Sequence, residues 1–358
     1  MTHSKHIFLV SFRYKPFKGV GVLRISYWFE MLKKKGFPVT LITAEEGNTE
    51  ENIIRIPLDS ENGFLSRIIR DKSFFWKKKL TNLLIKDNLL SENDVVLLTG
   101  GPFLYFMSVR KIRKKLPTVK IILDYRDPFA INPRFDNFIL KRKIKEIFEK
   151  SFNRNADCVI AVNDYCEKLF ITPPESVVIE NGYDEREFGD VDIATKDGKA
   201  FIYAGAFHHD RSPELFLNEV VFHPEQPIFH YCGNADLPVS NNRIINHGFQ
   251  TYQQTVDLLK KVSIGVIITG GKEFESTTKI FDYFAAKLKI LIITKGEVKT
   301  GNLQQIVRDN PNVVWAINEK NAIKEAMDSL LRNEYLDWKY TQFSRKNGFE
   351  KLLSVINK

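Results

Sequence analysis

Short apolar runs alternate with helical segments along almost the whole chain, and this alternation is what most constrains the fold. Residues 7–10 form an apolar run of strand length, and residues 38–43 form the next one. Between them, residues 21–35 carry apolar side chains mostly at three- and four-residue spacing, which is the period of a helix. This strand–helix–strand order predicts parallel strands joined by a right-handed crossover.

The alternation continues in two series. Further strand-sized runs of the first series lie at 94–99, 119–124 and 157–162. A second series starts near residue 199 and has runs at 201–205, 228–232, 263–268, 289–293 and 312–316. A chain of 358 residues is too long for one typical hydrophobic core. We therefore predict two Rossmann-like, doubly wound α/β domains that face each other across a cleft.

Turn-forming and acidic residues suggest where these domains end. Between the two series, Pro173-Pro174 and Asn181-Gly182 interrupt the apolar pattern. We expect a first domain over residues 1–171, an interdomain linker over 172–198 and a second domain over 199–334. Residues 335–358 are expected to form a C-terminal helix that can return to the first domain.

The positive charge is concentrated in the first half of the chain. Residues 1–154 hold 30 of the 53 lysines and arginines and 16 of the 44 acidic residues, so the rest of the chain is mildly acidic. Three basic stretches that also contain aromatic or aliphatic side chains contribute to this charge, at 67–80, 110–115 and 138–148. Basic amphipathic helices of this kind bind anionic lipid surfaces, whereas no nucleic-acid-binding motif accompanies the charge. The alternative for each stretch is a packed helix with a solvated outer face.

The cysteines and the apolar runs predict the compartment. The three cysteines have no paired spacing, which argues against disulfides and a zinc site and fits a reducing cytosol. The apolar run near the N-terminus is too short for a signal peptide, and the longest apolar runs are of strand length. We expect a cytoplasmic protein that is peripheral on the inner face of the cell membrane.

A glycine pair stands where a dinucleotide-binding fold places its phosphate loop. Gly19 and Gly21 lie between the first strand and the first helix, but the third glycine position holds Arg24. This departure argues against a dehydrogenase. The glycines still permit close approach of the backbone to a ligand, and a plain surface loop is the alternative.

Charged residues follow another apolar strand of the first domain directly. Asp124, Arg126 and Asp127 come at the carboxyl end of the run 119–124, one helical segment after the sequence TGGPF at 99–103. Ligands bind at this edge in open α/β sheets, so these residues are candidates for a catalytic site. The alternative is an Asp–Arg pair that only rigidifies the loop.

The second domain offers two candidate phosphate-binding segments. Gly205 permits a turn after the strand, and Arg211 precedes a helix near Ser212. Further on, the hydroxyl-rich stretch Ser276, Thr277 and Thr278 precedes a short helix that carries Asp282. Free amides at a helix start attract phosphate, and a carboxylate one turn later can accept hydrogen bonds from a ribose. The alternative is a buried helix in which a neighbour satisfies Asp282.

With these segments in place, the chain resembles the family 4 retaining glycosyltransferases of GT-B fold, in particular the bacterial branch with a DxRDPW-type motif. The likeness runs through almost the whole sequence in the same order. It includes residues 18–43, GGPF at 100–103, DYRDPF at 124–129, residues 156–188, YAGAFHHDRSPELFL from 203 and KIFDYFAAKLKILI from 279.

The resemblance implies a GT-B enzyme that needs no metal or other cofactor and transfers a sugar from a nucleotide-sugar with retention of configuration. The acceptor would be a glycan, lipid-linked or of a surface polysaccharide. Asp282 corresponds to the second acid of the E-x7-E motif, which holds the ribose, and Arg211 stands where a lysine usually contacts the diphosphate. Asp127, with Arg126 and Asp124, would lie near the acceptor and the reacting sugar. The expected donor-binding residues are Gly19, Gly21, Gly205, Arg211, Glu275, Ser276, Thr277, Thr278, Lys279 and Asp282.

Two positions depart from the family pattern. Phe274 stands where the first acid of the motif belongs, with Glu273 and Glu275 beside it, and Ala206 replaces an arginine that often follows the glycine. Two other functions therefore stay open: a nucleotide-sugar epimerase on the same fold, and a non-catalytic module that binds a nucleotide-sugar. The base, the sugar, the acceptor and the oligomeric state do not follow from the sequence.

Overall fold

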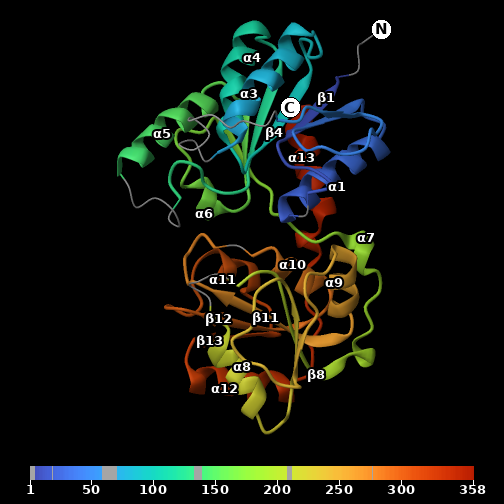
Figure 1. The fold of residues 1–358 in the computed structure, drawn as a ribbon, viewed down its shortest axis with the longest axis vertical. Helices are drawn as coiled ribbons and strands as arrows, with labels where there is room; N and C mark the ends of the chain where they lie inside the picture. Colours follow the sequence, from blue (N-terminus) through green and yellow to red (C-terminus); the bar gives the residue numbers. More distant parts are fainter. Residues whose placement is uncertain (1–4, 18, 59–70, 133–138, 208–211, 276) are drawn as a thin grey trace. The chain divides into compact units, whose positions relative to one another are not determined.

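The chain folds into two compact units, each built on its own parallel sheet (Figure 1). The structure is a computed structural model, and it describes residues 5–17, 19–58, 71–132, 139–207, 212–275 and 277–358. Unit 1 comprises Met1–Glu180 and Gly348–Lys358, and unit 2 comprises Asn181–Asn347.

The sheet of unit 1 has seven parallel strands in the order β3-β2-β1-β4-β5-β6-β7. The central strand β1 pairs in register with β2 on one side and β4 on the other. The strands are β1 (Ile7–Ser11), β2 (Val39–Thr43), β3 (Ile53–Arg55), β4 (Val95–Thr99), β5 (Lys120–Tyr125), β6 (Cys158–Ala161) and β7 (Glu175–Val178).

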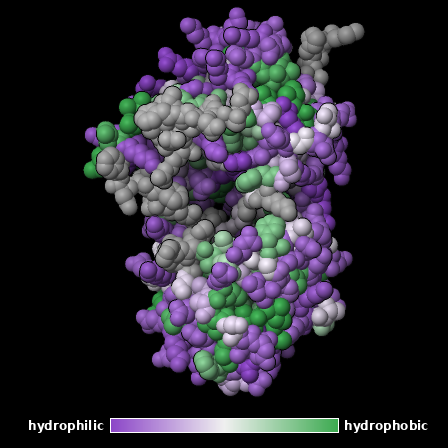
Figure 2. Space-filling view, in the orientation of Figure 1, coloured by the Kyte–Doolittle hydropathy of each residue, from purple (hydrophilic) through white to green (hydrophobic). Residues whose placement is uncertain are grey.

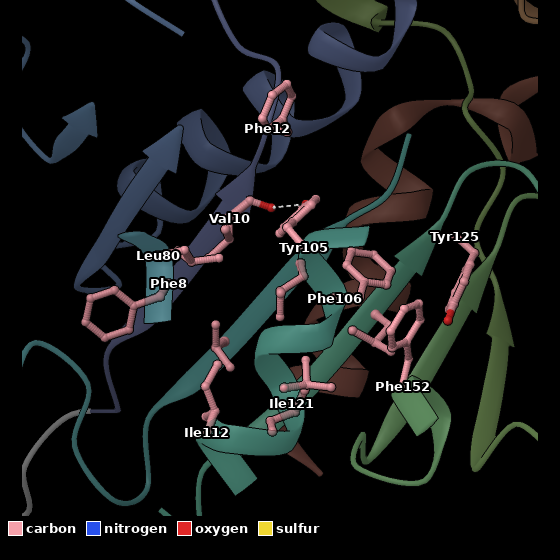
Figure 3. Packing of buried hydrophobic residues seen from close by; sticks show 14 of the residues in the cluster. Phe8, Val10, Phe12, Leu80, Tyr105, Phe106, Ile112, Ile121, Tyr125 and Phe152 are labelled. Atoms are coloured by element: carbon pink, nitrogen blue, oxygen red, sulfur yellow. Dashed lines mark hydrogen bonds between the residues drawn. The ribbon is translucent and has the colours of Figure 1, made fainter. Parts of the chain in front are cut away.

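Helices cover both faces of this sheet because alternate side chains of its strands are apolar on both sides. One face, with Phe8 and Val10, packs against α3 (Ser73–Thr81), η1 (Asn82–Lys86), η2 (Leu104–Ser108), α4 (Val109–Lys115) and α5 (Ile139–Asn153). Figure 3 shows this cluster, in which the Tyr105 hydroxyl donates to the Val10 carbonyl at 3.2 Å. The other face, with Ile7 and Leu9, packs against α1 (Val20–Lys34) and α13 (Arg345–Asn357). The short α6 (Asp164–Glu167) follows β6.

The sheet of unit 2 has six strands in the order β10-β9-β8-β11-β12-β13, all parallel. They are β8 (Asp197–Ala204), β9 (Ile228–Cys232), β10 (Ile244–Asn246), β11 (Val262–Thr269), β12 (Lys289–Thr294) and β13 (Val313–Ile317). One face is covered by α8 (Glu214–Phe222) and α12 (Lys320–Arg332), and the other by α9 (Tyr252–Leu259), α10 (Lys279–Ala285) and α11 (Gly301–Val307). Smaller elements are α7 (Glu185–Phe188), η3 (Ile193–Thr195) and η4 (Thr341–Phe343). The prediction of two doubly wound α/β domains is confirmed.

The segment expected to be a linker, residues 172–198, is instead divided between the two units. Its first part contains the edge strand β7, which pairs with β6 in unit 1, and its last part begins β8. Proline and glycine marked the segment as irregular, but a four-residue edge strand needs only one neighbour and leaves little pattern in the sequence. From Gly348 on, α13 belongs to unit 1, where Phe349, Leu352 and Ile356 are fully buried.

In the part of the chain that the structure describes, no helix is both long enough and apolar enough to span a bilayer.

Candidate functional site

In unit 1, an arginine lies across the carboxyl ends of the central strands. Arg126 follows β5, and its Nε donates to the carbonyl of Gly100 at 2.7 Å. Its Nη2 donates to the same carbonyl and, at 3.0 Å, to that of Gly101. The arginine thereby holds the loop after β4 against the loop after β5.

The same arginine explains one of the predicted glycines. A Cβ atom added at Gly21 would lie 1.2 Å from Nη1 of Arg126, so the guanidinium rests directly on the backbone of α1's first turn. Only glycine leaves room for this contact. At Gly19 the nearest atom to such a Cβ is Cε1 of Phe17, at 2.7 Å, and that ring is exposed. The structure therefore brings Gly21 and Arg126 together at the carboxyl edge, and Gly19 lies two residues before Gly21.

Asp124 does not lie on the surface of this edge, although the sequence made it a catalytic candidate. Its side chain is fully buried and pairs with Arg24, whose Nη2 donates to Oδ1 at 3.0 Å. The Thr99 hydroxyl donates to Oδ2 at 2.8 Å. Arg24 also donates to the carbonyls of Ile179 and Glu180, at 2.9 Å each. Asp124 thus lies in the core and holds Arg24, whereas Asp127 is exposed.

Two acidic residues that sequence reasoning missed hold the loops of this edge. Asp71 Oδ2 accepts from the backbone amides of Phe103 and Leu104, at 3.0 Å each. The buried Glu149 of α5 accepts from the amides of Ala130 and Ile171, both at 2.8 Å, and burial raises its pKa to about 7. Each acid lies far along the chain from a loop that it holds, so no local pattern signals its role.

In unit 2, two of the predicted donor residues meet at the carboxyl end of β8. The Lys279 Nζ lies 4.1 Å from the centre of the Tyr203 ring and 3.3 Å from a Cβ position built on Gly205. Gly205 has a φ of +126°, and its amide donates to the Cys232 carbonyl at 2.8 Å. A positive charge therefore lies beside a backbone turn that only glycine adopts readily.

One turn further along α10, Asp282 belongs to a charged cluster. The Tyr252 hydroxyl donates to its Oδ1 at 2.9 Å. Arg345 lies nearby, with its guanidinium carbon 5.8 Å from the Tyr252 ring centre and its Nη1 3.7 Å from Oδ2 of Asp184. Burial raises the pKa of Asp282 to about 6, although Arg345 and the Tyr252 hydrogen bond lower it. The residue is ionised at neutral pH and has a second oxygen, Oδ2.

Two backbone amides in the first turn of α10 are bonded to the residues just before it. The amides of Ile280 and Phe281 donate to the carbonyls of Thr277 and Thr278, both at 3.2 Å. The nearby Glu275 is buried and accepts from the Thr269 hydroxyl and, at 3.0 Å, from the Gly270 amide. The Lys279 side chain adds a positive charge at the start of this helix. The predicted residues Arg211 and Ser276 lie outside the described residues.

A polar cavity of about 390 Å³ lies at the carboxyl ends of β12 and β13 in the same sheet. It is lined by Ser212, Thr294, Lys295, Gly296, Ile317, Asn318 and Glu319. Within the described ranges, no group of three or more His, Cys, Asp or Glu side chains is arranged to hold a metal ion.

No protein-family model and no curated protein matches this chain. Solved structures do resemble it over nearly its whole length. An alpha-glucosyltransferase in complex with UDP superimposes with a TM-score of 0.63 at 11% identity, covering 99% of this chain and 100% of the other. The catalytic domain of starch synthase IV from Arabidopsis thaliana, bound to ADP and acarbose, gives a TM-score of 0.63 at 11% identity with 99% coverage of both chains.

A third structure, UDP-GlcNAc 2-epimerase from Methanocaldococcus jannaschii, gives a TM-score of 0.60 at 11% identity and covers 99% of each chain. At this identity the comparisons show the fold and nothing finer. The fold is GT-B, built from two Rossmann-like units.

Proposed function

We propose that this protein is a glycosyltransferase that moves a sugar from a nucleotide-sugar donor to a glycan acceptor. The observation that carries the proposal is the placement of Lys279 and Asp282 on α10. They are three residues apart and so lie on neighbouring parts of one helix surface. The lysine reaches Gly205 at the end of β8, and the aspartate reaches Tyr252 on α9. A cation and a carboxylate are thus spaced along the sheet edge where nucleotides bind in open α/β folds.

Each of the two side chains suits one part of the donor. The Lys279 ammonium would bind the diphosphate and stabilise the charge that grows on it as the sugar leaves. It supplies a cation beside Gly205, where Ala206 replaces the arginine of the family pattern. Asp282 Oδ2 would accept hydrogen bonds from the ribose hydroxyls, while Tyr252 holds the other oxygen. Neither role requires a metal or another cofactor.

The acceptor side of the reaction is assigned to unit 1. Its exposed Asp127 lies between Arg126, which donates to the Gly100 carbonyl, and Ala130, whose amide donates to Glu149. We propose a retaining transfer, in which the acceptor attacks from the face that the nucleotide leaves. We propose a lipid-linked or surface-polysaccharide glycan as the acceptor, because residues 1–154 carry most of the basic residues and suit an anionic membrane surface. The protein would then be cytoplasmic and peripheral on the inner face of the membrane.

The donor assignment is tested by calorimetry with UDP-, GDP- and dTDP-sugars and the matching free nucleosides. Lys279→Met is expected to weaken nucleotide-sugar binding at least about tenfold and to leave nucleoside binding unchanged, because only the diphosphate contact is lost. Asp282→Asn is expected to weaken both ligands, since both contain ribose. Lys324→Met, which removes an exposed lysine of α12, is the control. Equal affinities for all three variants and the wild type would refute the site.

An epimerase is the second candidate, because UDP-GlcNAc 2-epimerase is among the structures of the same fold. Incubation of the protein with the bound nucleotide-sugar alone, followed by chromatography of the sugar, separates the two functions. An altered sugar without any acceptor indicates an epimerase. Nucleotide release only in the presence of a glycan extract indicates a transferase, and binding without either product indicates a non-catalytic module.

A further inference from the structure

The helix α5 exposes large aliphatic side chains that a packed helix would bury. Ile139, Leu140, Ile144 and Ile147 are 75%, 63%, 47% and 68% exposed. They are four of the eleven large hydrophobic residues that are exposed in the described part of the chain. Isolated exposed aliphatics are common on proteins, but such a cluster on one helix marks an interaction surface.

These side chains form a stripe on the outer side of the helix. Leu140, Ile144 and Ile147 are spaced by four and three residues, so they lie on one face. The opposite face carries Glu149 and Phe152, which are buried against the sheet. Phe148, the last residue of the basic stretch 138–148, packs beside Phe152, with 6.4 Å between ring centres. The outer face of α5 is therefore mixed, with aliphatic side chains exposed among basic ones.

Basic residues flank the stripe along α5 itself. α5 contains Lys141, Arg142, Lys143, Lys145 and Lys150 against only two acids, of which Glu149 is buried. The helices α3 and α4, which cover the same face of the sheet, contribute Lys77, Lys78, Lys79, Arg110, Lys111, Arg113, Lys114 and Lys115 (Figure 1). Figure 2 shows hydrophobic atoms over α5 at the left edge of the view, among hydrophilic ones.

We infer that α5 is a membrane-docking helix that inserts Leu140, Ile144 and Ile147 into an anionic bilayer while its lysines bind the lipid phosphates. An aliphatic stripe with flanking cations matches the layered polarity of a bilayer surface, apolar below and anionic above. A second copy of the chain would bring two clusters of like charge together, and a nucleic acid would leave the stripe in water. The inference rests on the proposed membrane partner. It identifies α5 as the helix that contacts the membrane, and it adds that aliphatic side chains insert into the bilayer besides the attraction between charges.

The test uses the full chain and flotation with vesicles of phosphatidylcholine alone or mixed with phosphatidylglycerol. Wild type is expected to float with the anionic vesicles. Ile144→Ser/Ile147→Ser is expected to lose at least about tenfold in partitioning, at low and at high salt, because the inserted aliphatic area is removed. Lys143→Gln/Lys150→Gln is expected to lose binding mainly at low salt.

Two matched controls come from unit 2. Phe222→Ser removes an aromatic side chain that is 78% exposed on α8, and Lys320→Gln/Lys324→Gln removes two exposed lysines from α12. Both are expected to float like the wild type. Equal flotation of the α5 variants and these controls, or no flotation of the wild type, would overturn the inference.

A second readout reports on insertion itself. The emission of the added tryptophan in Ile147→Trp is expected to shift to the blue with anionic vesicles, whereas that in Phe222→Trp is not. Sedimentation velocity of the wild type and of Ile144→Ser/Ile147→Ser tests whether a second copy of the chain covers the stripe instead. A dimer that the substitutions dissociate would contradict membrane docking. Calorimetric donor binding is measured on the same variants in the absence of vesicles. Donor binding that the α5 variants retain shows that they are folded. Absence of donor binding in the wild type would count against the proposed catalytic function, and loss of flotation alone would leave that function standing.

Discussion

Both units have charged side chains at the carboxyl edge of a parallel sheet, but these side chains make different contacts in the two units. In unit 1, Arg126 is occupied by the Gly100 and Gly101 carbonyls, and Asp124 is buried against Arg24. In unit 2, Lys279 lies over the Tyr203 ring beside the Gly205 turn, and Asp282 is held through one oxygen by Tyr252. Unit 1 thus uses its charges to fix loops, whereas unit 2 keeps a cation and a carboxylate at the positions where a nucleotide would bind.

A charged residue at the end of a strand is therefore not by its position alone a ligand-binding residue. The Arg126 guanidinium donates to backbone carbonyls, and the Asp124 carboxylate is paired in the core, so both groups stabilise the fold. The Lys279 ammonium lies over an aromatic ring, and one oxygen of Asp282 accepts from Tyr252; these are the two side chains that we propose contact the donor. Four substitutions test this contrast between structural and ligand-binding charges.

The largest effect is expected for the buried pair of unit 1. Asp124→Ala leaves the guanidinium of Arg24 without its carboxylate and should lower the free energy of unfolding by about 3–5 kcal/mol. Urea unfolding measures this loss, and hydrogen exchange should localise it to β4 and β5. Arg24→Met/Asp124→Leu should lose less than the single variant. A double loss equal to the sum of the two single losses would show that the residues do not act as a pair.

The next effect is expected at Glu149. In Glu149→Gln one of the Ala130 and Ile171 amides faces an NH₂ group, which should cost about 1–3 kcal/mol of stability. Because the folded pKa is raised from 4.5 to about 7, the carboxyl of the wild type makes stability fall as pH rises through that interval. The glutamine lacks this slope. Its deficit should therefore be greatest in acid and shrink toward pH 7 in urea titrations, and a deficit independent of pH would contradict the assignment.

A smaller effect is expected at the glycine under Arg126. The methyl group of Gly21→Ala would displace Nη1 and weaken the bonds to the Gly100 and Gly101 carbonyls, at a cost of about 1–2 kcal/mol. Gly19→Ala, which meets only the exposed Phe17 ring, serves as the control. Gly21→Ala/Arg126→Ala should be no less stable than Arg126→Ala alone in thermal unfolding. If the stability losses of Gly21→Ala and Arg126→Ala simply added up in the double variant, contact with Arg126 would not be the reason for glycine at position 21.

The smallest change in stability, with the opposite sign, is expected in unit 2. Asp282 has a pKa raised from 3.8 to about 6, so its ionisation destabilises the fold as pH rises through that interval. Asp282→Asn should therefore stabilise the protein at pH 7, by roughly 1 kcal/mol after allowance for partial exposure. The same variant should lose nucleotide-sugar binding. Loss of stability at pH 7 would place Asp282 with the structural charges of unit 1.

Much of the site could be located from the sequence, because strand ends are local features. The apolar runs that end at or before Asp124 and Gly205 placed both at carboxyl ends, and a short helix carrying Asp282 was predicted after the hydroxyl-rich stretch 276–278. The partners could not be read in this way. Arg24 lies 100 residues from Asp124, and Tyr252 lies 30 residues from Asp282. Such pairings depend on which helices pack on which side of the sheet, and local patterns do not contain that information.

Three features could be read from the amino-acid sequence alone: the alternation of strands and helices, the division into two parallel sheets, and the excess of positive charge in the first half of the chain. These follow from hydrophobic period and composition, which each segment carries on its own. Tertiary structure alone decided that Asp124 is buried and Asp127 exposed, that Lys279 meets Gly205, and that α5 turns its aliphatic side outward. The physical reason is that helical periodicity shows which residues share a face but not whether the sheet or the solvent meets it.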